Sequence, residues 1–323
     1  MEKLKIVDLF AGAGGWTTGL KAAGHEVIWA VDNWEPAIET YRAEHGNHID
    51  KIDVMDLSSD HEKLLEADVI VGSPPCKRFS LLNKKRDYDL SLTQTFLNLT
   101  KSKPFVMENV PMVKKIVETN LNEYGGRNYL VKLKNFGVPQ HRTRFVKTNI
   151  LRLDGFMPEI ETDISYYLPF LDKVNGMEAF PNHSKRIEEK MSEVESGTQH
   201  PDHRFGVYYR IPRSGVSQCI VNVTKAMTIH PKFNRRLRAQ EAAVLQTFPV
   251  DYKFQGNIGQ RAEQVGNAVP PRFAYYIGLY LKYWWCEKPS LDDIDAHRSI
   301  WEKIYKEGNQ KKYNGYRNWE SFK

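Results

Sequence analysis

Short apolar segments alternate with amphipathic segments along the first half of the chain. Apolar or β-branched runs bounded by turn-forming residues predict strands at 4–9, 26–31, 48–54, 68–71 and 103–109. Helical periodicity predicts helices between them, at 16–23, 35–44, 91–100 and 112–119. Two more strands are predicted at 129–133 and 144–148. This alternation predicts a doubly wound α/β fold, in which ligands bind at the carboxyl ends of the strands.

The first strand leads into a glycine-rich turn and then directly into a helix. Gly12, Gly14 and Gly15 allow the backbone to approach a ligand closely, and such a unit binds a nucleotide-like cofactor at the helix N-terminus. The turn has no Lys-Ser or Lys-Thr pair, which argues against a phosphate-binding loop. Asp32 ends the second strand, where a carboxylate binds a ribose in such folds; its alternative role is to cap the helix at 35–44.

Two later strand ends also carry polar residues. Asp53 and Val54 end the third strand, and we expect them near an adenine ring. Glu108 and Asn109 follow three apolar residues, so we expect the carboxyl group to be partly buried. Burial favours a protonated carboxyl group that can donate a hydrogen bond. The alternative is that this pair caps the helix at 112–119.

The fourth strand runs into a stiff turn that ends in a cysteine. Pro74 and Pro75 have fixed φ angles, so Cys76 stands at the end of a rigid arm at the edge of the sheet. A free cysteine is usually a small buried hydrophobe. Beside the cations Lys77 and Arg78 it is equally suited to act as a nucleophile, because positive charge favours the thiolate.

Two further polar stretches stand out. The basic segment 77–89 has no regular period and follows Cys76, so it is either a lid that closes on a phosphate backbone or a solvated connection. Gln140, Arg142 and Arg144 alternate, so they share one face of the chain if it is extended. Because an apolar strand follows them, we interpret that face as the edge of a pocket.

The composition limits the class of protein. The 323 residues are 41% hydrophobic and 12% aromatic, which is typical of one large globular domain or two. The three cysteines form no CxxC pair, so the sequence predicts neither a disulfide framework nor a structural metal site. We identify no signal peptide and no membrane span, and expect a cytoplasmic protein with no membrane partner. The net charge of +6 weakly favours a polyanionic partner.

Together, four of these stretches and two later ones resemble the motifs of the DNA (cytosine-5) methyltransferases. They stand in the order usual for that family and span 4–281 of the chain. They are 8–15 (DLFAGAGG), 74–76 (PPC), 108–110 (ENV), 140–144 (QHRTR), 236–249 and 264–271 (QVGNAVPP).

The resemblance implies a Rossmann-like, S-adenosylmethionine-dependent core with a smaller inserted target-recognition domain. It implies that Cys76, Glu108, Arg142 and Arg144 are catalytic and that Ser80, Asn109 and Gln140 contact the substrate. Residues at the strand ends and in the last motif would bind S-adenosylmethionine: Phe10, Ala11, Gly12, Gly14, Gly15, Asp32, Asp53, Val54, Pro74, Asn267 and Val269. The reaction it implies is attack of the Cys76 thiolate on C6 of a flipped-out cytosine, followed by methylation at C5.

The resemblance also divides the chain. It implies a catalytic domain at 1–155, a target-recognition domain at 156–260, and a segment at 261–323 that returns to the catalytic domain. Helices are predicted at 184–195, 239–246 and 272–285, with a turn at 266–270 and a polar helix in the tail. In the second segment, cations and aromatic rings mix in a way that suits either DNA contacts or an ordinary strand: Arg204, Tyr208, Tyr209, Arg210 and Arg213.

The implied partner is double-stranded DNA, with a cognate restriction endonuclease as a second possible partner, and the implied state is a monomer in a prokaryotic or viral context. Two alternatives stay open, a tRNA cytosine-5 methyltransferase and an inactive DNA-binding regulator. Lys77 stands where the family has Gln. We expect Lys77 to contact a DNA phosphate; the alternative is that it accommodates an anionic group on a modified donor.

Overall fold

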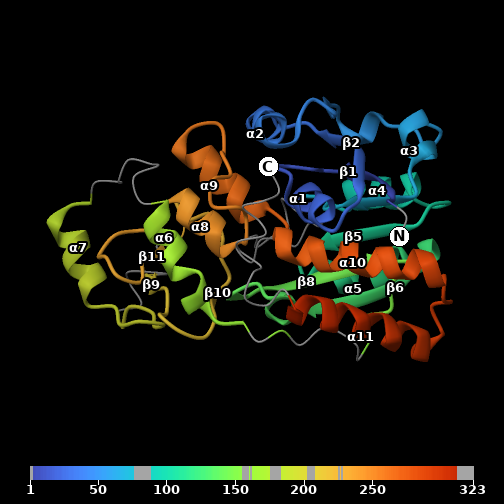
Figure 1. Ribbon diagram of the computed structural model, residues 1–323. Helices are drawn as coiled ribbons and strands as arrows, with labels where there is room; N and C mark the ends of the chain where they lie inside the picture. The colour runs from blue at the N-terminus through green and yellow to red at the C-terminus, as the bar shows by residue number, and fades with distance from the viewer. Residues whose placement is uncertain are drawn as a thin grey trace.

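The alternating elements of the first half form one twisted seven-stranded sheet (Figure 1). The strands run in the order β3-β2-β1-β4-β5-β8-β6, and β8 is antiparallel to both of its neighbours while the other pairs are parallel. The strands are β1 (Lys5–Leu9), β2 (Glu26–Asp32), β3 (Ile49–Lys51), β4 (Val69–Gly72), β5 (Phe105–Asn109), β6 (Arg127–Lys132) and β8 (Thr143–Thr148). The prediction of a doubly wound α/β fold is confirmed.

The computed structural model describes residues 3–75, 89–154, 160, 162–174, 183–201, 208–224, 226 and 228–310, with side chains as far as 304. Three residues predicted to act at the site, Cys76, Lys77 and Ser80, lie outside this range, as does nearly all of the loop predicted at 77–89. No helix in the described part of the chain is both long and apolar enough to cross a membrane.

Helices cover both faces of the sheet, and the alternation of side chains along each strand decides which face they meet. Val69 and Val71 of β4 pack with the core under α1 and α10, whereas Ile70 packs with the core under α4 and α5. The first face carries α1 (Gly15–Ala22), α10 (Pro271–Glu287), α11 (Ile294–Gln310) and η3 (Leu133–Phe136). The second carries α3 (Glu62–Glu66), α4 (Ser91–Leu99), α5 (Val113–Asn120), η1 (Val54–Asp56) and η2 (Asn122–Tyr124).

The helix that follows the glycine-rich turn packs very closely against the end of the chain. A Cβ atom on Gly19 of α1 would lie 2.3 Å from the carbonyl oxygen of Pro271 and 2.5 Å from Cβ of Ala274, both in α10. Glycine is therefore required there by packing rather than by a turn. The expected return of the 272–285 helix to the first domain is what the structure shows.

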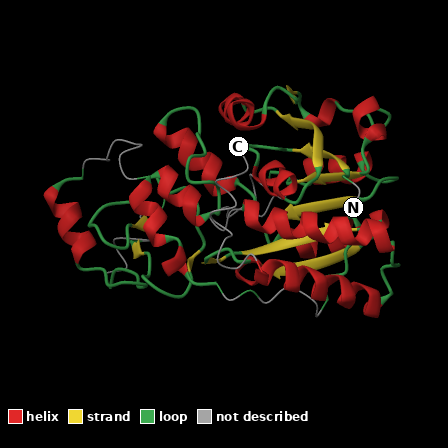
Figure 2. Cartoon of the chain, viewed as in Figure 1, coloured by secondary structure: helices red, strands yellow, loops and turns green. Residues whose placement is uncertain are grey.

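A smaller lobe extends from the carboxyl ends of the strands (Figures 1 and 2). Its core is formed by α6, the segments around β9 and β10, α8 and α9, and it includes Leu171, Ile220, Phe248 and Val265. Its elements are η4 (Ile164–Tyr166), α6 (Leu168–Lys173), α7 (Lys185–Ser192), β9 (Tyr209–Arg210), β10 (Ser217–Gln218), β11 (Thr228–Ile229), α8 (Ala239–Leu245) and α9 (Ile258–Asn267). Strand β7 (Gln140–His141) pairs with β10 and so joins the lobes.

Two expectations about the second half need correction. The turn predicted at 266–270 is wrong in its first part, because Gly266 and Asn267 form the end of helix α9, which packs on α8. A domain boundary after residue 260 would cut through this helix. Of the two alternatives for the segment around Arg210, the structure fits the strand: Arg210 lies in β9, and its buried guanidinium donates to the carbonyl oxygens of Met191, Val194 and His230. Arg213, by contrast, is exposed.

Candidate active site

The candidate site lies at the carboxyl edge of β1, β4 and β5, on the side of the sheet where the smaller lobe is attached. The strand order reverses between β1 and β4, since β2 and β3 follow on one side and β5 on the other. Open α/β sheets bind ligands at such a point, because the connections on either side diverge there. The glycine-rich turn follows β1 and the Pro-Pro arm follows β4, and these two strands are hydrogen-bonded neighbours.

The glycine-rich turn is held in a left-handed conformation. Phe10, Gly12 and Gly14 have φ angles of 58°, 54° and 84°. The Gly12 N–H donates to Oδ2 of Asp32 at 2.8 Å, which ties the turn to the end of β2. A Cβ atom on Gly12 would meet nothing within 4 Å, so this is the residue of the turn that opens to empty space.

The other two glycines make room for protein rather than for a ligand. A Cβ atom on Gly15 would lie 2.1 Å from the carbonyl oxygen of Val269 in the last motif. A Cβ atom on Gly14 would lie 2.6 Å from the His45 ring. Packing against protein therefore requires glycine at Gly14 and Gly15, and the contact of their backbone with a ligand stays a prediction. The turn and the last motif are in direct contact, as a shared cofactor site requires.

Asp32 at the end of β2 and Asp53 shape the neighbouring backbone. The predicted strand at 48–54 is shorter than expected, because β3 ends at Lys51 and Asp53 precedes η1. Asp32 Oδ1 accepts from the N–H of Trp34 at 2.9 Å, just before helix α2 (Glu35–His45), so its capping alternative is partly met while it also holds Gly12. Asp53 accepts from the N–H of Met55 at 3.0 Å and caps η1. Val54 is buried beside it.

Asp8 is a polar residue of the site that sequence reasoning did not single out. Its carboxyl group is fully buried, and Oδ2 accepts a 2.8 Å hydrogen bond from the Thr17 hydroxyl. Burial raises the pKa of Asp8 to about 7. No described residue donates to Oδ1. The signal that could have identified it is an acidic residue inside the apolar strand KIVDL, because burial of a carboxyl group is costly and indicates a functional or structural role.

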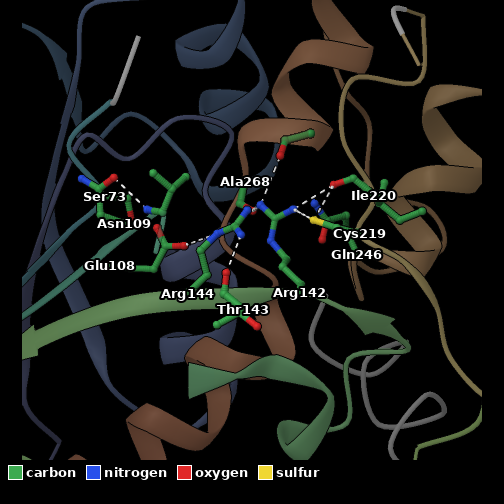
Figure 3. A network of polar contacts seen from close by, with 12 residues as sticks. Ser73, Glu108, Asn109, Arg142, Thr143, Arg144, Cys219, Ile220, Gln246 and Ala268 are labelled. Atoms are coloured by element: carbon green, nitrogen blue, oxygen red, sulfur yellow. Dashed lines mark hydrogen bonds and ion pairs between the residues drawn. The ribbon is translucent and has the colours of Figure 1, made fainter. Parts of the chain in front are cut away.

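The Pro-Pro arm after β4 is fixed from two sides. Trp16 Nε1 donates to Oγ of Ser73 at 2.9 Å, and Asn109 Nδ2 donates to the Pro74 carbonyl oxygen at 3.0 Å. Asn109 therefore links β5 to the arm, as Figure 3 shows, and does not cap α5, whose N-terminal residue Met112 has no side-chain cap. The position of Cys76 itself lies outside the described residues, two residues beyond this anchor.

Glu108 and Arg144 form an ion pair beside the anchored arm (Figure 3). Arg144 Nε lies 2.8 Å from Oε1 of Glu108, and the two side chains are 13% and 7% exposed. The expected burial of Glu108 is confirmed. The guanidinium of Arg144 is a partner that the sequence argument for a protonated acid left out. A carboxylate and a cation with little access to water can both hydrogen-bond a flat polar ring.

Gln140 and Arg142 lie next to this pair but point into the protein. Arg142 donates to the carbonyl oxygens of Ile220, Gly266 and Ala268 at 2.8, 3.2 and 3.1 Å (Figure 3). Burial lowers the pKa of Arg142 to about 10, so it remains charged. The prediction that the alternating residues share a face is consistent with this arrangement, but these contacts correct the prediction that Arg142 faces the base.

Gln140 has the same structural role. Its side chain has no exposure and donates to the carbonyl oxygen of Leu245 and to Oε1 of Gln246, both at 3.0 Å. Its own Oε1 accepts from the N–H of Ile220 at 2.8 Å. Gln140 and Arg142 thus join the sheet to the smaller lobe, and both polar atoms of the Gln140 side-chain amide bond to protein. Of the last motif, Val269 is buried and Asn267 is exposed.

Comparison with known proteins adds four findings. The model of the C-5 cytosine-specific DNA methylase family matches residues 4–163 and 171–282. The chain is 30% identical over 297 residues to the type II methyltransferase M.HindV of Haemophilus influenzae, covering 85% of this chain and 95% of that protein. It is 31% identical over 320 residues to the type II methyltransferase M1.HphI of Haemophilus parahaemolyticus, covering 85% of each. The solved structure of the Entamoeba histolytica methyltransferase EhMeth is similar in fold, with a TM-score of 0.64 at 15% identity over 90% of this chain and 100% of that one.

Proposed function

Because the chain belongs to the C-5 cytosine-specific DNA methylase family and is a DNA (cytosine-5) methyltransferase, we propose that it methylates flipped-out cytosines of double-stranded DNA through a covalent adduct with Cys76. The observation that carries the proposal is the Glu108–Arg144 pair, which stands beside the anchored Pro74 at the end of β5. A base inside a duplex cannot reach such a site, so the target must leave the stack.

The methyl donor of the proposal is S-adenosylmethionine, and the residues around the glycine-rich turn fit it. Gly12 borders open space, and its backbone is held in place by Asp32. The buried Oδ1 of Asp8 has no donor among the described residues. A cationic amino group is a suitable partner for that oxygen. Asp32 and Asp53 would hold the ribose side and the adenine side, with Phe10, Ala11, Val54, Pro74, Asn267 and Val269 around them. When bound, the donor supplies an electrophilic methyl group.

Cys76 acts in the proposal as the nucleophile. C6 of cytosine is a poor electrophile, but addition of a thiolate to it turns C5 into an enamine-like carbon that can accept a methyl group. Trp16 and Asn109 hold the arm at Ser73 and Pro74, which limits the freedom of the residue two positions after Pro74. Ser80, in the loop that follows, is proposed to contact the DNA.

Glu108 and Arg144 hold the base in the proposal. Glu108, once protonated, would donate a hydrogen bond to N3 of cytosine and accept one from its N4 amine, which withdraws electron density from C6 as the thiolate adds. Arg144 would keep the Glu108 carboxyl group oriented and contact O2 of the base. Asn109 acts through Pro74, and Gln140 and Arg142 act through the joint between the lobes. We assign target recognition to the smaller lobe, a monomer as the active form, and a restriction endonuclease as the cognate partner, since the relatives are named type II methyltransferases.

Trapping with 5-fluorocytosine tests the mechanism. Duplex DNA that contains the analogue should form a covalent complex with the wild type in the presence of S-adenosylmethionine, because fluorine at C5 blocks the elimination that releases the enzyme. Cys76→Ser should form no complex and show no turnover while its affinity for DNA is retained, since Ser provides no anion near neutral pH. Substantial methylation by Cys76→Ser would exclude the covalent mechanism.

Methylation and trapping assays together separate the alternatives. Methylation of tRNA in preference to duplex DNA would show that the substrate is RNA. Binding of DNA without any adduct in the wild type would indicate an inactive DNA-binding regulator. Mass spectrometry of the modified nucleoside distinguishes an ordinary methyl donor from a modified one.

A further inference from the structure

Three side chains contact the glycine-rich turn from behind: Thr18, His45 and Tyr252. None of them belongs to the six motifs that resemble the family. The Tyr252 hydroxyl donates to the carbonyl oxygen of Ala13. The Thr18 hydroxyl donates to the carbonyl oxygen of Gly14 at 2.7 Å. His45 lies between them, with Nε2 at 3.0 Å from the Tyr252 hydroxyl and 3.1 Å from the Thr18 hydroxyl.

The protons of this cluster can be assigned by accounting for each donor. Both hydroxyl protons are directed at backbone carbonyl oxygens, so each hydroxyl oxygen is left as an acceptor toward His45. His45 Nε2 must therefore carry a hydrogen and donate to both hydroxyls. The ring is neutral, because burial, with a smaller contribution from Lys21 and His48, lowers the pKa of His45 to about 3. The cluster is therefore a closed set of hydrogen bonds that ends on the peptide groups of Ala13 and Gly14.

The turn is shaped to fit this cluster. A Cβ atom on Gly14 would lie 2.6 Å from Nε2 of His45 and 2.9 Å from the Tyr252 hydroxyl. Gly14 also has a φ angle of 84°, which a residue with a side chain rarely adopts. The backbone of the turn therefore rests directly on the two side chains.

Tyr252 is anchored in the smaller lobe. Its ring is buried and packs against Phe248 and Phe254, with ring centroids 4.8 and 5.1 Å away, in the core that also contains α8 and α9. The residues that follow lie along α2: Lys253 N–H donates to Glu44 at 2.9 Å and Gln255 N–H donates to Thr40 at 2.8 Å. The smaller lobe thus reaches past the sheet edge and holds the turn from behind.

We propose that Tyr252 and His45 are positioning residues for the cofactor turn, and that the smaller lobe orders this turn for S-adenosylmethionine by supplying Tyr252. This inference rests on the cofactor site of the proposed function. A turn with several glycines loses much conformational freedom when it is fixed on a ligand. Because the cluster fixes Ala13 and Gly14 before the cofactor binds, the loss of conformational entropy in the turn does not reduce the affinity for the cofactor.

Isothermal titration of the full-length protein with S-adenosylmethionine tests the proposal. Tyr252→Phe removes one hydroxyl group and keeps the ring in its aromatic cluster. We expect the Kd for the cofactor to rise about tenfold, as loss of a hydrogen bond to a buried carbonyl oxygen allows. KM for the cofactor should rise in parallel while kcat at saturating cofactor changes less than about twofold. The Kd for duplex DNA without cofactor should not change.

Tyr280→Phe is the matched control. Tyr280 is also a buried tyrosine whose hydroxyl bonds to a histidine, His297, but it lies in α10 away from the turn. It should lower the melting temperature and leave the cofactor Kd at the wild-type value. His45→Gln, which keeps an N–H donor, should bind the cofactor better than His45→Leu, which has none.

Each outcome has a distinct meaning. If Tyr252→Phe and Tyr280→Phe lower the melting temperature similarly and neither changes the cofactor Kd, the positioning role is excluded. If both raise it equally, the effect is one of general stability and the proposal is again excluded. Failure of the wild type to bind S-adenosylmethionine would instead overturn the proposed cofactor, and with it the premise of this inference.

Discussion

Two neighbouring regions of the site use arginine in opposite ways. In the first region, at the end of β5, Arg144 pairs with the carboxylate of Glu108 and both side chains keep slight access to solvent. In the second region, the joint between the lobes, Arg142 is buried and donates to three backbone carbonyl oxygens. The two arginines stand two positions apart and on the same side of the chain (Figure 3). Their roles differ because Arg144 meets a carboxylate at the site, whereas Arg142 meets three backbone carbonyl oxygens and the thiol of Cys219.

This difference teaches which property should respond to mutation. A group that meets a carboxylate at the site can change the reaction without contributing much to folding. A group that satisfies buried carbonyl oxygens stabilises the fold, since each acceptor that loses its donor is costly inside the protein. Activity and stability should therefore separate cleanly between the two regions.

Glu108→Gln should have the largest effect. We expect methyl transfer to fall about 1,000-fold, because a neutral amide cannot stabilise the charge distribution of the activated ring as a carboxylate or carboxyl group does. The free energy of unfolding should change by less than about 1 kcal/mol, because the Gln oxygen still accepts from Arg144. Single-turnover methylation and urea unfolding of the same sample measure both. A loss of stability that matches the loss of rate would erase the contrast.

Arg142→Met should act in the reverse sense. We expect the free energy of unfolding to fall by about 3 kcal/mol, because three carbonyl oxygens lose a charged donor. Once saturated with DNA and cofactor at low temperature, the variant should recover most of its kcat. A variant as stable as the wild type but inactive would show that Arg142 acts on the base after all.

The buried Asp8 of β1 makes the stability of the protein depend on pH. Its pKa is about 7 in the folded protein against 3.8 for the ordinary group, so the folded state binds the proton more tightly. The stabilisation is complete below the unfolded pKa and is lost as pH rises through 7, which amounts to about 2 kcal/mol between pH 5.5 and pH 8. Urea unfolding of wild type and Asp8→Asn at several pH values should show this difference. Parallel curves would mean that Asp8 does not titrate in this range.

Trp16→Phe should have the smallest effect. It removes the 2.9 Å hydrogen bond to Ser73 and keeps most of the buried ring, so we expect a loss of about 1 kcal/mol in stability. The rate of adduct formation with 5-fluorocytosine DNA should fall a few-fold, because the arm that carries Cys76 is less constrained. Leu20→Ala in the same helix controls for core packing. If Leu20→Ala slows adduct formation as much as Trp16→Phe does, relative to its loss of stability, Trp16 has no positioning role.

The strands and their polar ends could be predicted because the signals are local. β-branched runs bounded by glycine or proline define β4 and β5, and the position of Glu108 at a strand end follows directly. The role of Arg142 could not be predicted, because its partners lie near residues 220 and 266 and no local pattern identifies them. Tyr252 and His45 were missed for the same reason, as 207 positions separate them.

Helix α9 was missed although the sequence carried its signal. Asn257 accepts from the N–H of Gln260, and the Gln260 side chain accepts from the N–H of Asn257, which is a capping box. Gly266 and Asn267 are turn-forming residues, and they led to the prediction of a turn instead. Burial of Ala262 and Val265 against the smaller lobe stabilises the helix despite those residues, and tertiary packing outweighs helix propensity there.

The close packing of α1 on α10 has a consequence for the order of folding during synthesis. Gly15 and Gly19 accommodate the backbone of Val269 and Pro271, which follow them by more than 250 positions. Non-local contacts of this kind form late, and at about 5–20 residues per second the ribosome needs about 10–50 seconds to reach them. Until then the nascent chain carries its glycine-rich turn without the segment that completes it. A fragment that ends before α10 therefore leaves much of one face of the sheet uncovered, with only α1 and η3 on it, and we expect such a fragment to be inactive and to need chaperones.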